Sequence, residues 1–354
     1  MKSILHLFRS SQFTEDYVTT VNKYAKNSMH FFLIFENFFL PEDYCYLFAD
    51  NIRYMPTIVY ELQKPNIIKY FDSFDKIIYH GVFEINIMKF FFYNSQLLNK
   101  LYLYFWGGDI PFLETTEENN IKKKIISEAK GIVTIIESDQ EKIDQLYKPI
   151  GKKYCMQYCA GNQIQDMKKY LYPHKKKYID KEILIQVGNS ATSTNNHIDI
   201  LKILEKYKKE NIKIFLPLAY GDQEYAEKII TYAKNIFGTK VLVQRNMLKM
   251  DEYIKEIKKV DIGIFAMTRQ QALGNIFMLG MNGAKLYMNR DGQNYKYLTE
   301  KLNCSISYID EINQMDFNSF ISISESARMN NYEQILKINE TDYKMKKWND
   351  FFEA

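Results

Sequence analysis

The feature that most constrains how this chain can fold is an alternation of short apolar runs with longer amphipathic segments. In the second half the runs are separated by stretches with helical periodicity, such as 197–209 and 223–236. Strands that alternate with helices in this way are typical of βαβ units, so the pattern predicts a parallel sheet covered by helices. The expected strands are 183–187, 212–216, 240–243, 262–265 and 285–288.

The first half shows the same alternation, with expected strands at 4–8, 31–35, 57–60, 76–79, 101–105 and 132–136 and a helix over 139–150. A chain of 354 residues is long enough for two domains. We therefore predict an α/β protein of two Rossmann-like, doubly wound lobes with a cleft between them. The predicted division is a first lobe 1–165, a linker 166–180, a second lobe 181–330 and a helical tail 331–354. The aromatic side chains of the tail are expected to pack back toward the first lobe.

Composition excludes several classes of protein. A net charge of +4 is too small to indicate a nucleic-acid partner. The cysteines are scattered, without a CxxC pair, so we expect no disulfide, no zinc site and a reducing cytoplasm. The most apolar segment, 31–40, is shorter than the roughly 20 residues of a membrane-spanning helix. Short lysine clusters at 122–124, 175–177 and 344–347 fit either solvated surfaces or a basic face on anionic lipid.

In doubly wound sheets, ligands bind at the carboxyl ends of the strands, where helix N-termini offer free N–H groups. After the expected strand 183–187 the chain reads Gly188-Asn189-Ser190, followed by Asn195 and His197 at the start of a helix. Glycine permits close backbone approach, and hydroxyl and amide side chains supply neutral donors for a sugar phosphate. The same residues also cap helices, so both interpretations stay open.

A second polar loop follows the expected strand 262–265 and contains Arg269, Gln270, Gln271, Gly274 and Asn275. Arg269 has the geometry to clamp a pyrophosphate through two charge-assisted hydrogen bonds, or to form a structural ion pair. Tyr220 follows the strand 212–216 and either stacks on a base or sugar or simply packs. We predict that these residues form part of the same nucleotide-sugar site.

Candidate catalytic residues come from the first half. Trp106-Gly107-Gly108-Asp109 follows one expected strand and His80 another, while His6 is expected at the end of the first strand. A turn that exposes Asp109 would let it act as the general base toward an acceptor hydroxyl. The alternatives are a turn-forming aspartate and structural histidines.

Missing motifs narrow the chemistry. No GxGxxG follows the first strand, and neither a P-loop nor GxSxG occurs. The absence of Asp-x-Asp argues against a metal–carboxylate clamp, so we expect no metal or cofactor. Charge on a departing diphosphate would then be met by Arg269, helix dipoles and backbone N–H groups.

Taken together, these motifs resemble a known family: the bacterial TDP-N-acetylfucosamine:lipid II N-acetylfucosaminyltransferases, also described as 4-alpha-L-fucosyltransferases, or glycosyltransferase family 56. The resemblance covers most of the chain in order. The stretches that carry it are 183–190, Asn196-His197-Ile198, Leu216-Pro217 with Tyr220, Arg269-Gln270-Gln271 with Gly274, Asn289-Arg290, His80-Gly81 and Trp106-Gly107-x-Asp109.

The resemblance implies a GT-B architecture, a dTDP-activated deoxy-amino sugar as donor and a lipid-linked saccharide as acceptor. It also implies peripheral attachment to the cytoplasmic face of the inner membrane. One position departs from the family pattern: relatives carry histidine two residues before the tryptophan, where this chain has Tyr104. The donor is therefore the firmer expectation and the acceptor the weaker one. A sugar-nucleotide epimerase and a non-catalytic nucleotide-sugar-binding protein are the alternative functions.

Overall fold

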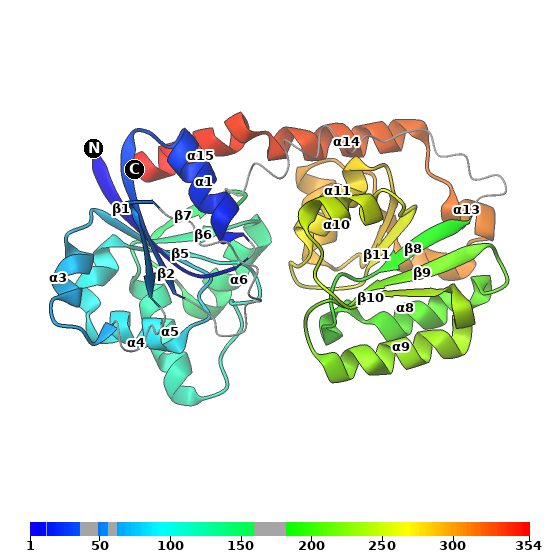
Figure 1. Ribbon diagram of the computed structural model, residues 1–354, viewed down its shortest axis with the longest axis horizontal. Helices are drawn as coiled ribbons and strands as arrows, with labels where there is room; N and C mark the ends of the chain where they lie inside the picture. The colour runs from blue at the N-terminus through cyan, green and yellow to red at the C-terminus, as the bar shows by residue number, and fades with distance from the viewer. Residues whose placement is uncertain (12, 36–48, 56–61, 159–181) are drawn as a thin grey trace. The chain divides into compact units, whose positions relative to one another are not determined.

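The computed structural model describes the chain except for residues 12, 36–48, 56–61 and 159–181 (Figure 1). It divides into two compact units, one of Met1–Gln163 with Asn339–Ala354 and the other of Ile164–Ile338. The expected strand 57–60 and the expected linker 166–180 lie outside the described residues.

The first unit contains, within the described residues, a seven-stranded sheet of order β3-β2-β1-β4-β5-β6-β7 whose pairings are all parallel. The strands are β1 (Lys2–Arg9), β2 (Ser28–Phe35), β3 (Ile52–Met55), β4 (Lys76–His80), β5 (Leu101–Tyr104), β6 (Gly131–Thr134) and β7 (Lys152–Cys155). The helices are α1 (Thr14–Tyr24), α3 (Ile67–Asp72), α4 (Ile85–Tyr93), α5 (Thr116–Glu128), α6 (Glu137–Tyr147) and α15 (Thr341–Glu353), with the 3-10 helix η1 (Ser95–Lys100).

Alternation along β1 explains why this unit needs the C-terminal helix. Leu5 and Leu7 belong to the apolar core that also contains residues of α3 to α6. Ile4 and Phe8 point to the opposite face, where α1 alone is too narrow to cover a parallel sheet. Helix α15 completes that face beside α1 (Figure 1), and its Trp348 is fully buried there with Phe351 and Phe352.

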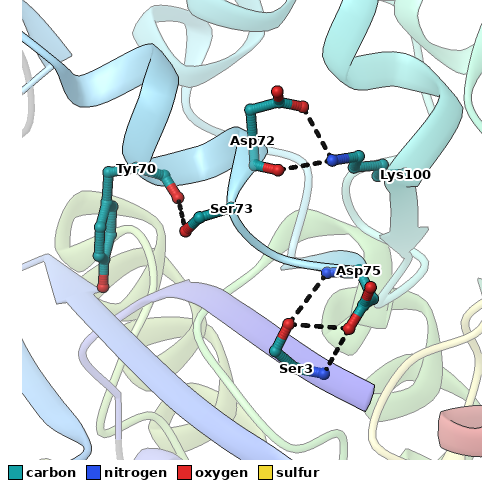
Figure 2. Close-up of polar contacts among 6 residues, drawn as sticks. All are labelled: Ser3, Tyr70, Asp72, Ser73, Asp75 and Lys100. Atoms are coloured by element: carbon teal, nitrogen blue, oxygen red, sulfur yellow. Dashed lines mark hydrogen bonds and ion pairs between the residues drawn. The ribbon is translucent and has the colours of Figure 1, made fainter.

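Local polar pairs close the amino-terminal edge of this sheet (Figure 2). The carboxylate of Asp75 accepts hydrogen bonds from the backbone N–H and the hydroxyl of Ser3, at 2.8 and 2.9 Å. Lys100 pairs with Asp72 at 2.8 Å, which joins the end of α3 to the start of β5. These contacts lie at the amino-terminal edge, whereas the carboxyl edge carries the loops that we predicted to be functional.

The second unit has, within the described residues, a six-stranded parallel sheet of order β10-β9-β8-β11-β12-β13. Its strands are β8 (Ile183–Val187), β9 (Ile212–Pro217), β10 (Val241–Gln244), β11 (Ile262–Phe265), β12 (Lys285–Met288) and β13 (Ser307–Tyr308). Its helices are α8 (His197–Leu204), α9 (Gln223–Phe237), α10 (Met250–Ile257), α11 (Leu273–Met281), α12 (Gln293–Lys296), α13 (Phe317–Ile321) and α14 (Glu325–Asn339), with a π-helical turn (Tyr297–Lys301) and the 3-10 helices η2 (Ser193–Asn195), η3 (Glu205–Tyr207), η4 (Gly238–Lys240) and η6 (Ile309–Gln314). Helices α8 and α9 cover one face and α10 and α11 the other (Figure 1).

The α/β class with two parallel sheets is thus confirmed, and several details of the prediction need correction. Strand β7 escaped prediction because its sequence, KKYC, is polar and half exposed at a sheet edge. The tail is two helices, α14 and α15, separated at Glu340. Lys122 and Lys344 belong to predicted surface clusters, but both side chains are buried.

Candidate active site

The loop after β8 is folded around the side chain of Asn195. Its amide donates to the carbonyl oxygens of Ser190 and Thr192 and to the hydroxyl of Thr192, at 3.1, 3.2 and 2.9 Å. Its Oδ1 accepts the backbone N–H of Asn189 at 3.2 Å. Since Asn195 and Ser190 are fully buried, they build this loop from within.

Gly188 opens the loop with a φ of +68°, in the left-handed region that favours glycine. A Cβ at this position would lie 2.6 Å from Nε2 of His197, so the backbone lies directly against the imidazole. His197 is fully buried, and burial lowers its pKa to about 4. The ring is therefore a neutral support beneath the loop, with Nδ1 3.4 Å from the hydroxyl of Tyr225.

Side-chain hydrogen bonds bring three of the predicted loops together. Gln271, after β11, donates to Oδ1 of Asn189 at 3.0 Å and accepts from the hydroxyl of Thr194 at 2.8 Å, both in the segment after β8. The amide of Asn189 donates to the hydroxyl of Tyr220, after β9, at 2.6 Å. A parallel bridge between Ala191 and Gly221 joins the same two segments through the backbone.

The residues that the three loops expose differ from the buried residues that support the loops. Tyr220 is 47% exposed, Arg269, Gln271 and Asn275 are partly exposed, and Gly274 is exposed. Burial raises the pKa of the Tyr220 phenol. The positive charge of the Arg269 guanidinium has a smaller effect and lowers that pKa. The positive charge therefore lies near the tyrosine that joins the first two loops.

Helix α11 begins at this surface. Ala272 precedes it with a φ of +63°, and Gly274 lies in its first turn, where a methyl group in place of its hydrogen would meet nothing within 4 Å. The first amide groups of a helix lack acceptors within the helix and carry partial positive charge. Asn275, in the same turn, accepts from Gln186 of β8 at 2.8 Å, which aligns the helix start with the sheet. Space for a ligand and free N–H groups thus coincide at Gly274.

A fourth segment, after β12, joins the site; its Asn289-Arg290 carries part of the family resemblance, but none of its residues was among our predicted site residues. Gln293 accepts the backbone N–H of Gln270 at 2.8 Å, and Asn294 donates to the carbonyl oxygen of Gln271 at 2.6 Å. Gln270 and Asn294 are buried, and each keeps a side-chain oxygen that has no hydrogen-bond partner among the described residues. The signal that would have found this segment is Asn289-Arg290-Asp291-Gly292 directly after a buried strand.

In the first unit, Asp109 is placed differently from our expectation. The side chain is 2% exposed, so the turn buries the carboxylate that we predicted to be accessible. One oxygen accepts the N–H of Val82 at 2.7 Å, and the other accepts the N–H of Trp106 at 2.9 Å. Burial raises the pKa of this carboxyl to about 6, and the two backbone hydrogen bonds act in the opposite direction. The arrangement ties the loop after β4 to the loop after β5.

A buried lysine and tyrosine fix the far side of the same loop. The ammonium of Lys122 donates to the carbonyl oxygens of Asp109 and Pro111, at 2.6 and 2.7 Å. The hydroxyl of Tyr147 donates to the carbonyl oxygen of Ile110 at 2.6 Å. The loop 105–111 is therefore held rigidly, with Trp106 at its start.

His6 and His80 lie in a buried chain of imidazoles. His6 is inside β1, with Arg9 as the last residue of the strand, so our placement of His6 at the strand end was wrong. Its Nδ1 lies 3.3 Å from Nε2 of His80, and its Nε2 lies 2.9 Å from Nδ1 of His30. Burial lowers the pKa of His80 to about 3 and of His30 to about 4, and it lowers that of His6 well below the usual value. All three rings are neutral members of the core under α15.

Neither a metal cluster nor a membrane span occurs in the described part of the chain. No three histidine, cysteine or acidic side chains there are arranged to hold a metal ion. No helix among the same residues is both long and apolar enough to cross a bilayer.

The fold and the loop arrangement define a class of protein. Sucrose-phosphate synthase from Thermosynechococcus elongatus matches 100% of this chain and 98% of its own at 10% identity, with a TM-score of 0.71. A glycosyltransferase from Rickettsia africae matches 99% and 98% at 12% identity, with a TM-score of 0.69. A structure described as E. coli trehalose-6-phosphate bound with UDP-2-fluoro glucose matches 99% of each chain at 10% identity, with a TM-score of 0.67. The fold is that of the GT-B glycosyltransferases.

The chain can also be assigned to one family among the proteins that share this fold. Residues 11–328 match the model of the 4-alpha-L-fucosyltransferases, glycosyl transferase group 56, and the chain belongs to this family. It is therefore a glycosyltransferase.

Proposed function

We propose that the enzyme transfers a deoxy-amino sugar of the fucosamine type from a dTDP donor to a lipid-linked saccharide in the synthesis of a cell-surface polysaccharide. One observation supports the donor site most directly. Side-chain hydrogen bonds of Gln271, Asn189 and Tyr220 link three polar loops beside the open first turn of α11. Neutral donors, one arginine and free helix amides are the chemistry that a sugar diphosphate requires.

In the proposed reaction, the acceptor hydroxyl attacks the anomeric carbon of the donor while the bond from that carbon to the diphosphate oxygen breaks. The dTDP leaves with the bonding electron pair, and we propose that Arg269 and the N–H groups of α11 stabilise its charge without a metal ion. The hydroxyl proton passes to a base. Asp109, His80 and His6 are the residues that we predicted for this step, and an Asp109→Asn protein separates a base from a structural role.

Ligand-dependent thermal stability tests the donor site directly. A ligand at 100 times its dissociation constant raises the free energy of unfolding by about 2.7 kcal/mol. We expect dTDP to raise the melting temperature, UDP to do so less and chelation of metals to leave the dTDP effect unchanged. If no nucleoside diphosphate changes the melting temperature of the folded protein, the donor site is refuted.

Product analysis tests the reaction. With a dTDP-sugar and a lipid-linked saccharide, we expect dTDP release together with a longer saccharide. Conversion of the free nucleotide sugar without an acceptor would instead identify an epimerase, and binding without turnover would identify a binding protein. We further propose peripheral attachment to the inner face of the plasma membrane, which predicts sedimentation with anionic vesicles that weakens as salt rises.

A further inference from the structure

Helix α4 of the first unit is apolar on almost every side. Its sequence, INIMKFFFY, contains only Asn86 and Lys89 besides apolar and aromatic residues. The residues of its inner face, which are buried in the core, are Ile87, Met88, Phe90 and Phe91. A helix at the surface of a domain usually carries polar and charged side chains on its outer face, so the outer face of α4 is unusual.

That outer face exposes aromatic rings to solvent. Tyr93 is 72% exposed, and Ile85, Lys89 and Phe92 are partly exposed. Residues 85, 89, 92 and 93 have the spacing of one side of a helix. The rings of Phe92 and Tyr93 meet edge to face, with centroids 5.3 Å apart. We call Ile85, Lys89, Phe92 and Tyr93 the α4 stripe.

Lysines border the α4 stripe. The ammonium of Lys124, on the neighbouring helix α5, lies 4.9 Å from the ring centre of Phe92, and Lys123 beside it is exposed. In the part of the chain that the structure describes, none of Lys89, Lys123 and Lys124 forms an ion pair. Their positive charge can therefore interact with an anionic partner.

Carboxylates leave most of this positive charge uncompensated. Glu84, the N-cap of α4, accepts hydrogen bonds from the backbone and the side-chain amide of Asn86, at 3.3 and 2.9 Å. The acidic residues of α5 lie toward its two ends, at Glu117, Glu118 and Glu128. Aromatic rings with unpaired lysines at their border fit the boundary of an anionic bilayer, where rings enter the headgroup region and ammonium groups meet phosphates.

From this combination we infer that the α4 stripe rests on an anionic lipid bilayer, with α4 parallel to the membrane plane. The inference rests on the proposed function, because it gives the proposed peripheral attachment a surface. Helix α4 begins beyond the carboxyl end of β4, so this orientation brings that edge of the sheet close to the membrane, where a lipid-linked saccharide is anchored. A protein groove would cover the rings equally well but would need a carboxylate opposite each lysine, whereas a bilayer presents anionic groups along the whole stripe.

Helix α15 provides a matched control on the opposite face of the same sheet (Figure 1). Its Tyr343 is 38% exposed, and the ammonium of Lys347 lies 5.0 Å from the centre of that ring. Lys346 and Lys347 are adjacent and exposed, which makes them comparable to the lysine pair of α5. Asp342 and Asp350 are also exposed on α15, so anionic lipid is not favoured there.

Sedimentation with vesicles tests the lysine border. We expect the wild-type protein to sediment with vesicles of equal parts phosphatidylglycerol and phosphatidylcholine, and far less with phosphatidylcholine alone. Lys123→Gln/Lys124→Gln should lower the partition coefficient by about fivefold for each lysine removed. Lys346→Gln/Lys347→Gln removes the same charge from α15 and should bind as wild type does.

Tryptophan emission tests whether the stripe itself meets lipid. We expect Tyr93→Trp to add an emission component that moves to shorter wavelength with anionic vesicles and is quenched by brominated lipid. The component added by Tyr343→Trp should stay unchanged, and both spectra are compared with that of wild type, which contains Trp106 and Trp348. Tyr93→Ala should weaken vesicle binding about two- to fivefold.

Three results overturn the inference: no sedimentation of wild type with anionic vesicles, a loss in the α5 lysine pair that does not exceed the loss in the α15 pair, or no emission shift in Tyr93→Trp. Failure of the proposed transfer reaction is a separate result, since its donor site is measured by dTDP in the melting experiment. All of these variants change exposed or partly exposed side chains, so we expect them to keep the full dTDP stabilisation.

Discussion

The side-chain amide of Gln271 donates a hydrogen bond to Oδ1 of Asn189, 3.0 Å away, and this contact joins the loop after β11 to the loop after β8. The same nitrogen lies 3.2 Å from the hydroxyl of Thr192, and the amide oxygen accepts from Thr194. A single partly exposed side chain therefore holds two loops of the candidate donor site in one arrangement.

We expect Gln271→Ala to weaken dTDP binding about tenfold, because neutral hydrogen bonds contribute about 0.5–1.5 kcal/mol each and two or more are lost. Gln271→Glu should weaken it further through repulsion of the diphosphate. Calorimetric titration with dTDP measures both. Gln314→Ala, an exposed glutamine on η6, is the matched control, and an equal loss in that variant would contradict a local role for Gln271.

The two glycines of the donor site should respond in opposite ways to alanine. Gly188→Ala places a Cβ 2.6 Å from His197 at a φ of +68°, so we expect a loss of about 2 kcal/mol or more in the free energy of unfolding. Gly274→Ala meets nothing within 4 Å in a helix, where alanine is favoured by up to about 1 kcal/mol. Chemical denaturation checks both values.

The same Gly274→Ala protein tests the ligand position. If the diphosphate approaches the first turn of α11, the added methyl group should weaken dTDP binding in a protein that is at least as stable as wild type. Unchanged dTDP affinity in Gly274→Ala would place the diphosphate elsewhere on the surface of the second unit.

The structure indicates that Asp109 holds two loops together, and one variant separates this role from catalysis. Asn at this position keeps one acceptor oxygen and replaces the other with a donor that faces an N–H group. We expect Asp109→Asn to lower the free energy of unfolding by about 1–3 kcal/mol, since one buried N–H loses its acceptor. If Asp109 is also the base, the same variant should in addition lose about 10²- to 10⁴-fold in kcat. Denaturation and steady-state rates on the same sample distinguish the two.

How well each strand could be predicted depends on how apolar its sequence is. Strands β8 and β11, which are apolar and largely buried, were predicted within a residue of their ends, and so was β10, whose sequence VLVQ is apolar although none of its residues is fully buried. The polar strand β7 and the two-residue β13 carry no such signal and were missed. The burial of Lys122 could not be predicted from the local sequence either, because the carbonyl groups that surround its ammonium come from a distant loop.

Some features of the candidate site could likewise be predicted from the sequence, and others could not. Loop composition after β8 and β11 pointed to residues that the structure brings together through side-chain hydrogen bonds, and their role in donor binding stays a prediction. Which of them face solvent was not predictable, since Asn195 and His197 are buried only once the loop wraps around them.

The buried imidazoles predict a marked loss of stability in acid. In the folded state the pKa values of His30 and His80 are lowered to about 4 and about 3, and His197 to about 4, against about 6.5 in the unfolded chain. Between those values the unfolded chain binds more protons, so the free energy of unfolding falls as pH falls from about 6.5 toward 4. Each histidine adds about 1.4 kcal/mol per pH unit to the slope. Urea denaturation at intervals from pH 7 to pH 4.5 measures it.

His30→Asn tests whether the cluster carries this slope. His30 is buried beside Phe352 of α15, with ring centroids 4.6 Å apart, and its Nε2 has no partner in the part of the chain that the structure describes, so protonation places a charge in an aromatic core. We expect the variant to reduce the slope by about one proton while it remains less stable than wild type at pH 7, because His6 loses its partner. The slope that remains when His6, His30 and His80 are all replaced is the share of His197 and of the other titrating groups. A slope unchanged in that triple variant would show that groups other than the imidazoles under α15 govern the acid response.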